Sequence, residues 1–198
     1  PLGYLGQMQE SGRDQGHAVM ALCCALDVCQ IGFNQGDDLY AYMDDRIVAG
    51  CEYVCAQNYA GVSPTDLPWI IYEYADCAGP RGASWQMPCA DSRGVGERRP
   101  NWDRIRGYYE GLRGVKLTFT DKAAELLCPD GGGGNYNANS GGFDHLGFSS
   151  LTNYRPLISP EDAITPLSGD IVYKGDTLKE QTNLGGLKYK YMHGPSAA

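Results

Sequence analysis

Apolar residues recur at helical spacing along the first third of the chain. Residues 14–33 are apolar almost all round, which predicts a helix buried on several sides. Ser11 and Asp14 precede its first apolar turn and are the candidates for its N-cap. A second helix is expected over residues 38–58, and residues 32–36 supply the turn between the two. Two antiparallel helices with a short connection form a helical hairpin.

The middle of the chain alternates loops with shorter periodic segments. Residues 60–100 are rich in Pro, Gly and Ser, which is typical of loops. Helical spacing returns over residues 101–113. Thr120 and Asp121 are candidates to cap a fourth helix that continues through Leu127.

A glycine-rich segment and a strand-like tail complete the chain. The four consecutive glycines at residues 131–134 exclude a regular element. The segment around them is either a loop that packs through its aromatic side chains or a flexible linker. Two alternating stretches near the C-terminus predict a small β-hairpin. The sequence therefore predicts a mainly α fold over residues 1–157, with long Gly-rich loops, and an extension with short strands over residues 158–198.

Composition and charge narrow the class of protein. A content of 42% hydrophobic and 20% charged residues in 198 excludes wholesale disorder. With 16 Lys and Arg against 24 Asp and Glu, the net charge of −8 argues against a nucleic-acid partner. We expect no apolar run long enough to span a bilayer, and hence no membrane partner.

Tyrosines and a basic patch bear on the choice of ligand. The 14 tyrosines, against four phenylalanines, suit a wall that stacks on sugars and moves protons, unless Tyr only replaces Phe at half-exposed positions. A polyanionic partner requires a local basic patch on so acidic a chain. Arg93, Arg98 and Arg99 form the main one. They either attract such a partner or pair with Glu97 and Asp103.

The eight cysteines favour an oxidising compartment. An even number is typical of structural disulfides, and the alternative is a set of buried thiols. Cys51 and Cys55 are one helical turn apart, but no Cys-x-x-Cys pair or nearby His accompanies them, so we expect no metal site. The N-terminus lacks the features of a secretory signal. We expect a secreted protein whose signal has been removed, or a chain that starts inside a larger protein.

The densest group of chemically able side chains precedes the first helix, at Glu10, Arg13, Asp14, Gln15 and His17. Arg13 and His17 are four residues apart and share a helix face. Arg binds a carboxylate through two hydrogen bonds, and a neighbouring His exchanges protons near neutral pH. A helix start adds N–H donors for an anion. The pattern indicates a reaction on a carboxylated substrate, unless Glu10, Arg13 and Asp14 only pair with one another.

Several motifs resemble those of the alginate lyase superfamily and occur in the same order. Residues 10–17 give its ESGRDQGH pattern. Further matches are Asn34-Gln35-Gly36, Asp38-Leu39-Tyr40, Asp45-Arg46, Glu52-Tyr53 and Asn58-Tyr59. Residues 98–115 resemble the family's R-P-W-x-x-x-Y-x-x-Y helix, and residues 131–151 resemble its glycine-rich segment. The resemblance covers about residues 7–155.

The resemblance implies an (α/α) toroid of helix pairs, here incomplete. It also implies cleavage of a uronic-acid polysaccharide, such as alginate or a glucuronan, by β-elimination. Arg13 would steady the substrate carboxylate or a tyrosine, and His17 would act as base or neutralise charge. Tyr109 is the first choice for the proton-transferring tyrosine, with Tyr53 and Tyr108 in reserve. The resemblance implies no metal and no cofactor.

Substrate contacts are expected along the same motifs, from Gln15, Tyr53, Asn58, Trp102, Asn135 and His145. Plainer interpretations exist for some of these residues. Tyr109 shares an apolar helix face and suits the core as well. Asn58 suits the end of the second helix as a cap, and His145 suits a loop as a hydrogen-bonding residue.

Departures from the family pattern leave other classes open. Related lyases supply an Asn from a helix ahead of the ESGRDQGH segment. Two residues after His17, where a tyrosine of some relatives is expected, this chain has Val19. The chain therefore resembles the C-terminal half of a lyase, partnered by an N-terminal half or another copy of itself. The alternative is a non-catalytic carbohydrate-binding or structural extracellular relative. A glycoside hydrolase needs two carboxylates about 5–9.5 Å apart, and Glu10 and Asp14 are weak candidates because both lie at one helix start.

Overall fold

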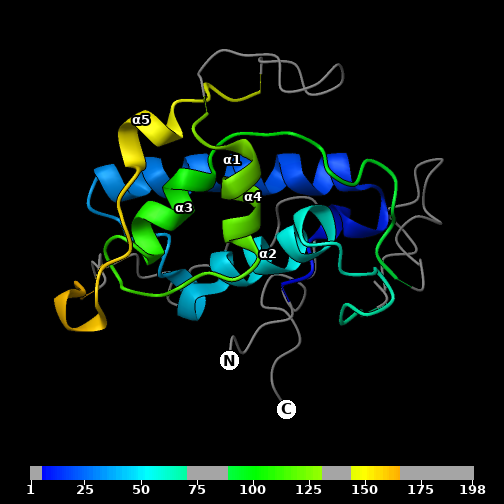
Figure 1. Ribbon diagram of the computed structural model, residues 1–198, viewed down its shortest axis with the longest axis horizontal. Coiled ribbons are helices and arrows are strands. Elements are labelled where there is room, and N and C mark those ends of the chain that lie inside the picture. The colour runs from blue at the N-terminus through cyan, green and yellow to red at the C-terminus, as the bar shows by residue number, and fades with distance from the viewer. Residues whose placement is uncertain (1–5, 71–88, 131–143, 166–198) are drawn as a thin grey trace, which may run out of the picture. The chain divides into compact units, whose positions relative to one another are not determined.

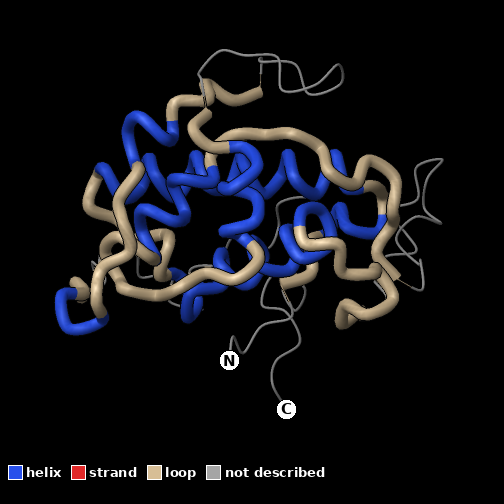
Figure 2. Tube along the Cα trace, in the orientation of Figure 1, coloured by secondary structure: helices blue, strands red, loops and turns tan. Residues whose placement is uncertain are grey.

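The computed structural model describes residues 6–70, 89–130 and 144–165. All belong to the compact unit Pro1–Leu167, and the second unit, Ser168–Ala198, lies outside them. The elements in chain order are η1 (Gln9–Gly12), α1 (Gln15–Asn34), α2 (Tyr42–Tyr59), α3 (Trp102–Tyr109), α4 (Thr120–Leu127), α5 (Ser149–Asn153) and η3 (Pro160–Asp162). The mainly α fold is confirmed, and the described ranges contain no strand (Figure 2). The stretches predicted to form the β-hairpin lie outside these ranges.

The predicted hairpin of α1 and α2 is confirmed (Figure 1). Of the two candidate caps for α1, Asp14 is the N-cap, and its side chain accepts the His17 N–H at 2.9 Å. α2 returns along α1, so that Asn58, near its end, donates to Gln15 at the start of α1 at 2.9 Å. The facing sides of the two helices supply core residues, among them Leu22, Leu26, Cys51, Val54 and Cys55.

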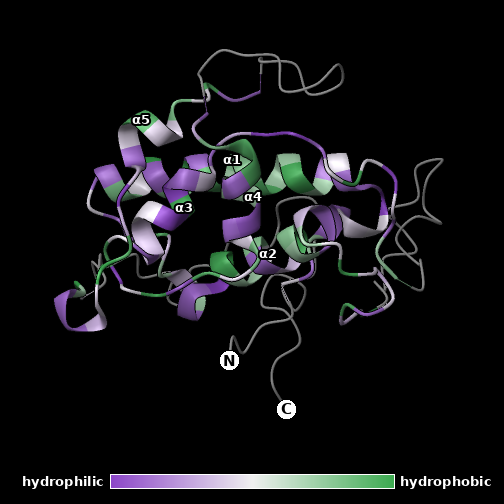
Figure 3. Ribbon diagram, in the orientation of Figure 1, coloured by the Kyte–Doolittle hydropathy of each residue, from purple (hydrophilic) through white to green (hydrophobic). Residues whose placement is uncertain are grey.

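α1 is buried on one side only, which differs from the expectation of a helix enclosed on several sides. Leu22 and Leu26 are fully buried, whereas Val28 and Ile31 are more than half exposed. By length and composition α1 is apolar enough to cross a membrane, which corrects the expectation that no segment is. In the folded unit the helix forms a wall of the core, and α2 and α3 pack on it (Figure 3).

α2 begins at Tyr42 rather than at residue 38 because tertiary contacts occupy the residues before it. Asp38 accepts a hydrogen bond from the Tyr108 hydroxyl of α3 at 2.6 Å. Residues 43–45 then have φ values of 51°, 53° and 63°, a left-handed conformation that is costly for residues other than glycine. Asp45, the third of these residues, accepts a hydrogen bond from Arg113 at 3.1 Å. This bond holds the turn to the segment after α3.

α3 ends at Tyr109 rather than at residue 113, where the chain turns toward α4. Gly107 faces the end of α5, and a Cβ there would meet the Asn153 carbonyl oxygen at 2.0 Å. Only glycine permits so close an approach of the two backbones. The Ile158 N–H donates to the Glu110 carbonyl at 3.1 Å. The compact unit therefore extends past residue 157, where the sequence placed the domain boundary.

The start of α4 is capped by a residue of α2. Glu52 accepts the backbone N–H groups of Thr118, Phe119 and Thr120 at 2.9–3.1 Å. These are the N–H groups that a helix start leaves unpaired, and a carboxylate there also suits the helix dipole. The cap predicted from Thr120 and Asp121 is therefore supplied by tertiary contact instead.

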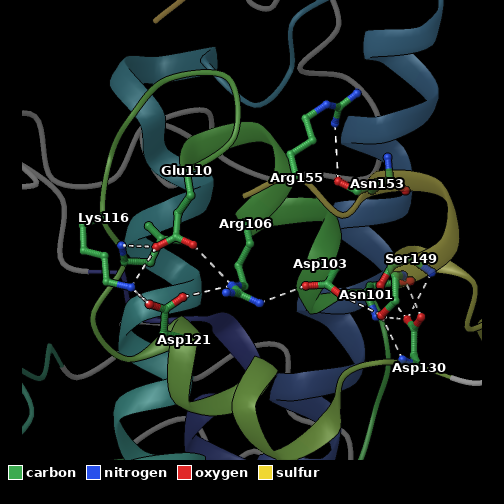
Figure 4. A network of polar contacts seen from close by, with 12 residues as sticks. Asn101, Asp103, Arg106, Glu110, Lys116, Asp121, Asp130, Ser149, Asn153 and Arg155 are labelled. Carbon is green, nitrogen blue, oxygen red and sulfur yellow. Dashed lines mark hydrogen bonds and ion pairs between the residues drawn. The ribbon is translucent and has the colours of Figure 1, made fainter. Parts of the chain in front are cut away.

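Charged side chains at α3 and α4 form a network around three buried carboxylates (Figure 4). Arg106 donates at 3.0–3.3 Å to three carboxylates, those of Asp103, Glu110 and Asp121. Lys116 donates to two of them, Glu110 and Asp121. All three acids are less than a tenth exposed. Because an unpaired buried charge is strongly destabilising, the network holds α3, α4 and the turn between them in one arrangement.

Asp130 joins the start of α3 to the start of α5 (Figure 4). Its carboxylate accepts the backbone N–H groups of Asn101, Ser149 and Ser150 at 2.8–3.2 Å. Burial raises the pKa of this carboxyl, but the hydrogen bonds from Ser149, Ser150 and Asn101 outweigh burial and hold the pKa below its ordinary value.

The seven cysteines that the structure describes are free thiols, so the expected disulfides are not formed among them. Cys23, Cys51 and Cys55 are fully buried, and burial raises the pKa of each thiol. Protonated thiols in such surroundings are unreactive and pack as small apolar groups. Cys23, Cys51 and Cys55 are therefore buried thiols, which was the alternative to structural disulfides. Cys77 lies outside the described residues.

Replacing Asp130 with Ala should lower the free energy of unfolding by about 3 kcal/mol, because three backbone N–H groups, two of them in buried hydrogen bonds, lose their acceptor. Urea denaturation followed by circular dichroism measures the change. Asp66→Ala, at an exposed position, is the control and should change the free energy by less than about 0.5 kcal/mol. A loss that small for Asp130→Ala would contradict the role assigned to Asp130.

Asp130 should also make the fold sensitive to acid. Its pKa is lower in the folded chain than the ordinary value of 3.8. Its stabilisation is therefore fully present above the unfolded pKa and is lost as the pH falls through the folded pKa. Melting temperatures measured from about pH 5 to pH 2 should fall less steeply for Asp130→Asn than for the wild type. Equal slopes would show that Asp130 does not contribute.

Candidate functional site

Asp14 and His17 form a dyad at the start of α1. Both Asp14 carboxylate oxygens lie 2.7–2.8 Å from Nδ1 of the His17 ring. Burial raises the pKa of Asp14, but hydrogen bonds from the His17 N–H and ring, and the nearby charges of His17 and Arg13, hold it below its ordinary value. Asp14 therefore stays ionised. In a neutral imidazole, a carboxylate at Nδ1 favours the tautomer with its proton on Nδ1, which leaves Nε2 as acceptor. The His17 side chain is 36% exposed, so a substrate can reach it.

Arg13 lies beside the dyad. Its Nη1 donates to Glu10 at 3.3 Å, and its Nε is 3.8 Å from Asp14 Oδ2. This Nε is buried and has no hydrogen-bond partner within the described ranges. The alternative in which Glu10, Arg13 and Asp14 pair with one another is therefore realised in part. It leaves the Arg13 side chain 29% exposed, and Arg13 and His17 both lie against the Asp14 carboxylate.

Gln15 and Asn58 lie next to the dyad, but their amides are used inside the protein. Gln15 is 1% exposed and Asn58 7%. Asn58 Nδ2 donates to Gln15 Oε1, and Gln15 Nε2 donates to the Asp91 carbonyl, both at 2.9 Å. Asn58 Oδ1 accepts the Gly96 N–H at 3.1 Å. The two side chains, expected to contact substrate, instead position the segments that surround the dyad.

Residues 91–97, named the strap here, run beside the start of α1. The Arg93 carbonyl accepts the Gln15 N–H at 2.8 Å. Gly94 has φ +71°, and a Cβ on it would stand 3.0 Å from the Gly16 nitrogen. The close approach and the backbone conformation both require glycine there. The sequence predicted only a loop over residues 60–100 and did not single out this ordered segment. Gly94 and Gly96 were the signal that could have indicated it.

The strap brings a second carboxylate to the site. A Cβ on Gly16 would stand 3.3 Å from Asp14 Oδ1 and 3.7 Å from Glu97 Oε1, so the two acids flank the same glycine. The Tyr59 hydroxyl donates to the Glu97 carbonyl at 2.6 Å and fixes the strap to the end of α2. Glu97 was foreseen only as a partner for the basic patch.

The structure does not bring Tyr109 to His17. The Tyr109 hydroxyl donates at 2.7 Å to the Tyr40 carbonyl, in the connection that follows α1. Because α1 has 20 residues, it is about 30 Å long, and His17 lies in its first turn. Tyr109 is 1% exposed and burial raises its pKa, as for a core residue. The reserve tyrosines, Tyr53 and Tyr108, donate their hydroxyls to Pro68 and Asp38.

Two of the remaining predicted contact residues, Trp102 and His145, are not assembled at the dyad. Trp102 is fully buried in the core, and its Nε1 donates to the Arg99 carbonyl at 2.7 Å. His145 is 5% exposed, and its Nδ1 lies 3.1 Å from Asp27 Oδ2, in the middle of α1. Asn135 lies outside the described residues.

The predicted basic patch is divided between two environments. Arg99 is buried and donates to Asp144 at 2.6 Å. Arg93, on the strap, is 70% exposed and donates to Asp91 at 3.0 Å. Their carboxylate partners therefore differ from the expected Glu97 and Asp103. Arg93 and Arg98 are both exposed, whereas Arg99 is not.

The chemistry of the site follows from the dyad, Arg13 and the strap. In the described part of the chain, no group of three or more His, Cys, Asp or Glu side chains is arranged to hold a metal ion. No protein-family model, curated protein or solved structure matches the chain. An exposed imidazole oriented by a carboxylate, with a guanidinium beside it, suits proton transfer on an anionic substrate.

Gly94→Ala should destabilise the strap more than the same change at a matched position. Gly61 has the same φ of +71° but nothing within 4 Å of the added Cβ. Both variants should lose about 1 kcal/mol or more through the left-handed conformation. Gly94→Ala should lose more, because the Gly16 backbone must move. Equal losses in urea denaturation would show that the approach of the strap to α1 is unimportant.

Proposed function

We propose that the chain is a polysaccharide lyase that cleaves a uronic-acid polysaccharide, such as alginate or a glucuronan, by β-elimination. The observation that carries the proposal is the Asp14–His17 dyad, exposed at the start of a helix beside Arg13. The motif resemblance over about residues 7–155 supports the same chemistry. The α1–α2 hairpin suits an (α/α) toroid of which this chain supplies a part, completed by an N-terminal half or a second copy.

The dyad supplies the base and the acid of this reaction. Asp14 holds the proton on Nδ1, so Nε2 of His17 accepts the proton from C5 of the uronate. The electron pair left on C5 forms a double bond to C4, and the bond from C4 to the glycosidic oxygen breaks. The imidazolium of His17 then returns its proton to that oxygen. Proton transfer by a positioned group contributes about 100- to 10,000-fold to the rate.

Arg13 stabilises the charge that develops. Removal of the C5 proton makes the neighbouring carboxylate an enolate, whose extra charge a guanidinium binds more tightly than it binds the ground state. The N-terminus of α1 adds a favourable dipole for the same anion. Glu10 accepts a hydrogen bond from Arg13 at 3.3 Å. When substrate binds, its carboxylate replaces Glu10 as the partner of Arg13.

A non-catalytic carbohydrate-binding relative is the second candidate. It is favoured by the hydroxyls of Tyr53, Tyr108 and Tyr109, which donate to acceptors in the protein rather than to the dyad. In either case we propose a secreted protein that binds an anionic polysaccharide without a cofactor.

The unsaturated product of β-elimination absorbs at about 235 nm, which gives a direct test on a panel of polyuronates. His17→Gln should lower kcat by at least about 100-fold, because it removes the base. Asp14→Asn keeps an acceptor for the helix cap but loses the charge that orients the ring, and should give a smaller loss.

Gln9→Ala, at an exposed residue of η1, is the control and should keep full activity. Undiminished activity of His17→Gln would overturn the assignment of the base. If the wild type binds polyuronates but releases no absorbing product from any of them, the binding protein is the correct alternative.

A further inference from the structure

Arg93 is an exposed side chain that the protein nevertheless holds in place. Its Nε donates to Asp91 at 3.0 Å, and its Nη2 donates to the Arg13 carbonyl at 2.5 Å. Its own N–H donates to Asp91 Oδ1 at 2.6 Å, which ties the pair together within the strap. A long surface side chain loses rotamer freedom when it is fixed. Arg93 is thus preorganised, and its Nη1 is not engaged by the described residues.

The contact with the Arg13 main chain brings two guanidinium-bearing residues together at the dyad. Other arginines of the described core are used differently. Arg99, Arg104, Arg106 and Arg113 pair with internal carboxylates and are 26% exposed or less. Arg93, at 70% exposed, is open to a ligand from solvent.

We propose that Arg93 binds a second carboxylate of the substrate, on the sugar next to the one whose carboxylate Arg13 binds. The inference rests on the proposed function and adds a substrate class, namely a polymer of contiguous uronates. Arg suits this task because the guanidinium stays charged and its unengaged Nη1 carries two N–H donors for a carboxylate. In a polymer that alternates uronates with uncharged sugars, the neighbouring sugar has no carboxylate, and Arg93 has no ligand there.

Equilibrium binding to the full-length His17→Gln chain tests the inference without turnover. Calorimetry would compare a contiguous polyuronate, polymannuronate, with an alternating polymer, hyaluronan. Arg93→Gln, added to this chain, should weaken binding of polymannuronate about 10-fold and of hyaluronan less than about 2-fold. Arg93→Lys should recover part of the loss, because it restores the charge but not the guanidinium.

Lys122→Gln is the matched control, since Lys122 is also an exposed cation paired with a neighbouring acid, Glu125. It should leave both affinities unchanged, and the melting temperature of each variant should stay that of its parent. In the active chain, Arg93→Gln should raise KM for polymannuronate with little change in kcat.

The outcomes separate this inference from the proposed function. Equal affinity of polymannuronate with and without Arg93 overturns the inference and leaves β-elimination standing. A lowered melting temperature with equal weakening for both polymers assigns Arg93 a structural role and overturns the inference as well. Binding that depends on Arg93, without any product at 235 nm, supports the inference and overturns the lyase. Failure to bind any polyuronate overturns both.

Discussion

The hydrogen bond between the buried amides of Gln15 and Asn58 is the constraint on which the site depends. It ties the start of α1 to the end of α2. The Gln15 amide N–H also donates to the Asp91 carbonyl, and the Asn58 amide oxygen accepts the Gly96 N–H, so both side chains hold the strap. A buried amide group left unpaired costs about 1–3 kcal/mol, so these bonds form together. The dyad and Arg93 consequently stand on a junction of three segments, which gives them fixed positions relative to one another.

The other end of α1 is organised by buried tyrosines and charges instead. Tyr108 donates to Asp38, Tyr109 to the Tyr40 carbonyl, and Arg113 to Asp45, so these polar groups have internal partners. Such groups stabilise one arrangement of the chain, because leaving any of them unpaired inside the protein is costly. The candidate site lies at the opposite end of α1, where the His17 side chain is 36% exposed.

The periodicity of apolar residues was sufficient to predict the α1–α2 hairpin, and with it Asp14 as a candidate cap. It did not predict the helix boundaries that are set by contacts with residues distant in sequence. α2 starts late because Asp38 is used by α3, and α4 is capped by Glu52 from α2. α3 ends at Tyr109, before the end of the range 101–113 that its apolar spacing predicted, and Gly107 faces the backbone of α5. None of these partners is near in sequence, so no local pattern contains them.

The sequence by itself determined the local part of the candidate site. Arg13, Asp14 and His17 lie within five positions, and the cap places Asp14 against His17. Arg13 lies before α1, at the end of η1, so the expected shared helix face with His17 is not formed. Only the tertiary structure decided that Gln15 and Asn58 are buried, that Tyr109 lies at the far end of α1, and that the strap brings Arg93 and Glu97 to the dyad. The physical reason is that spacing along a helix fixes neighbours within a turn or two. Contacts between distant segments depend instead on how their backbones pack and which buried polar groups find partners.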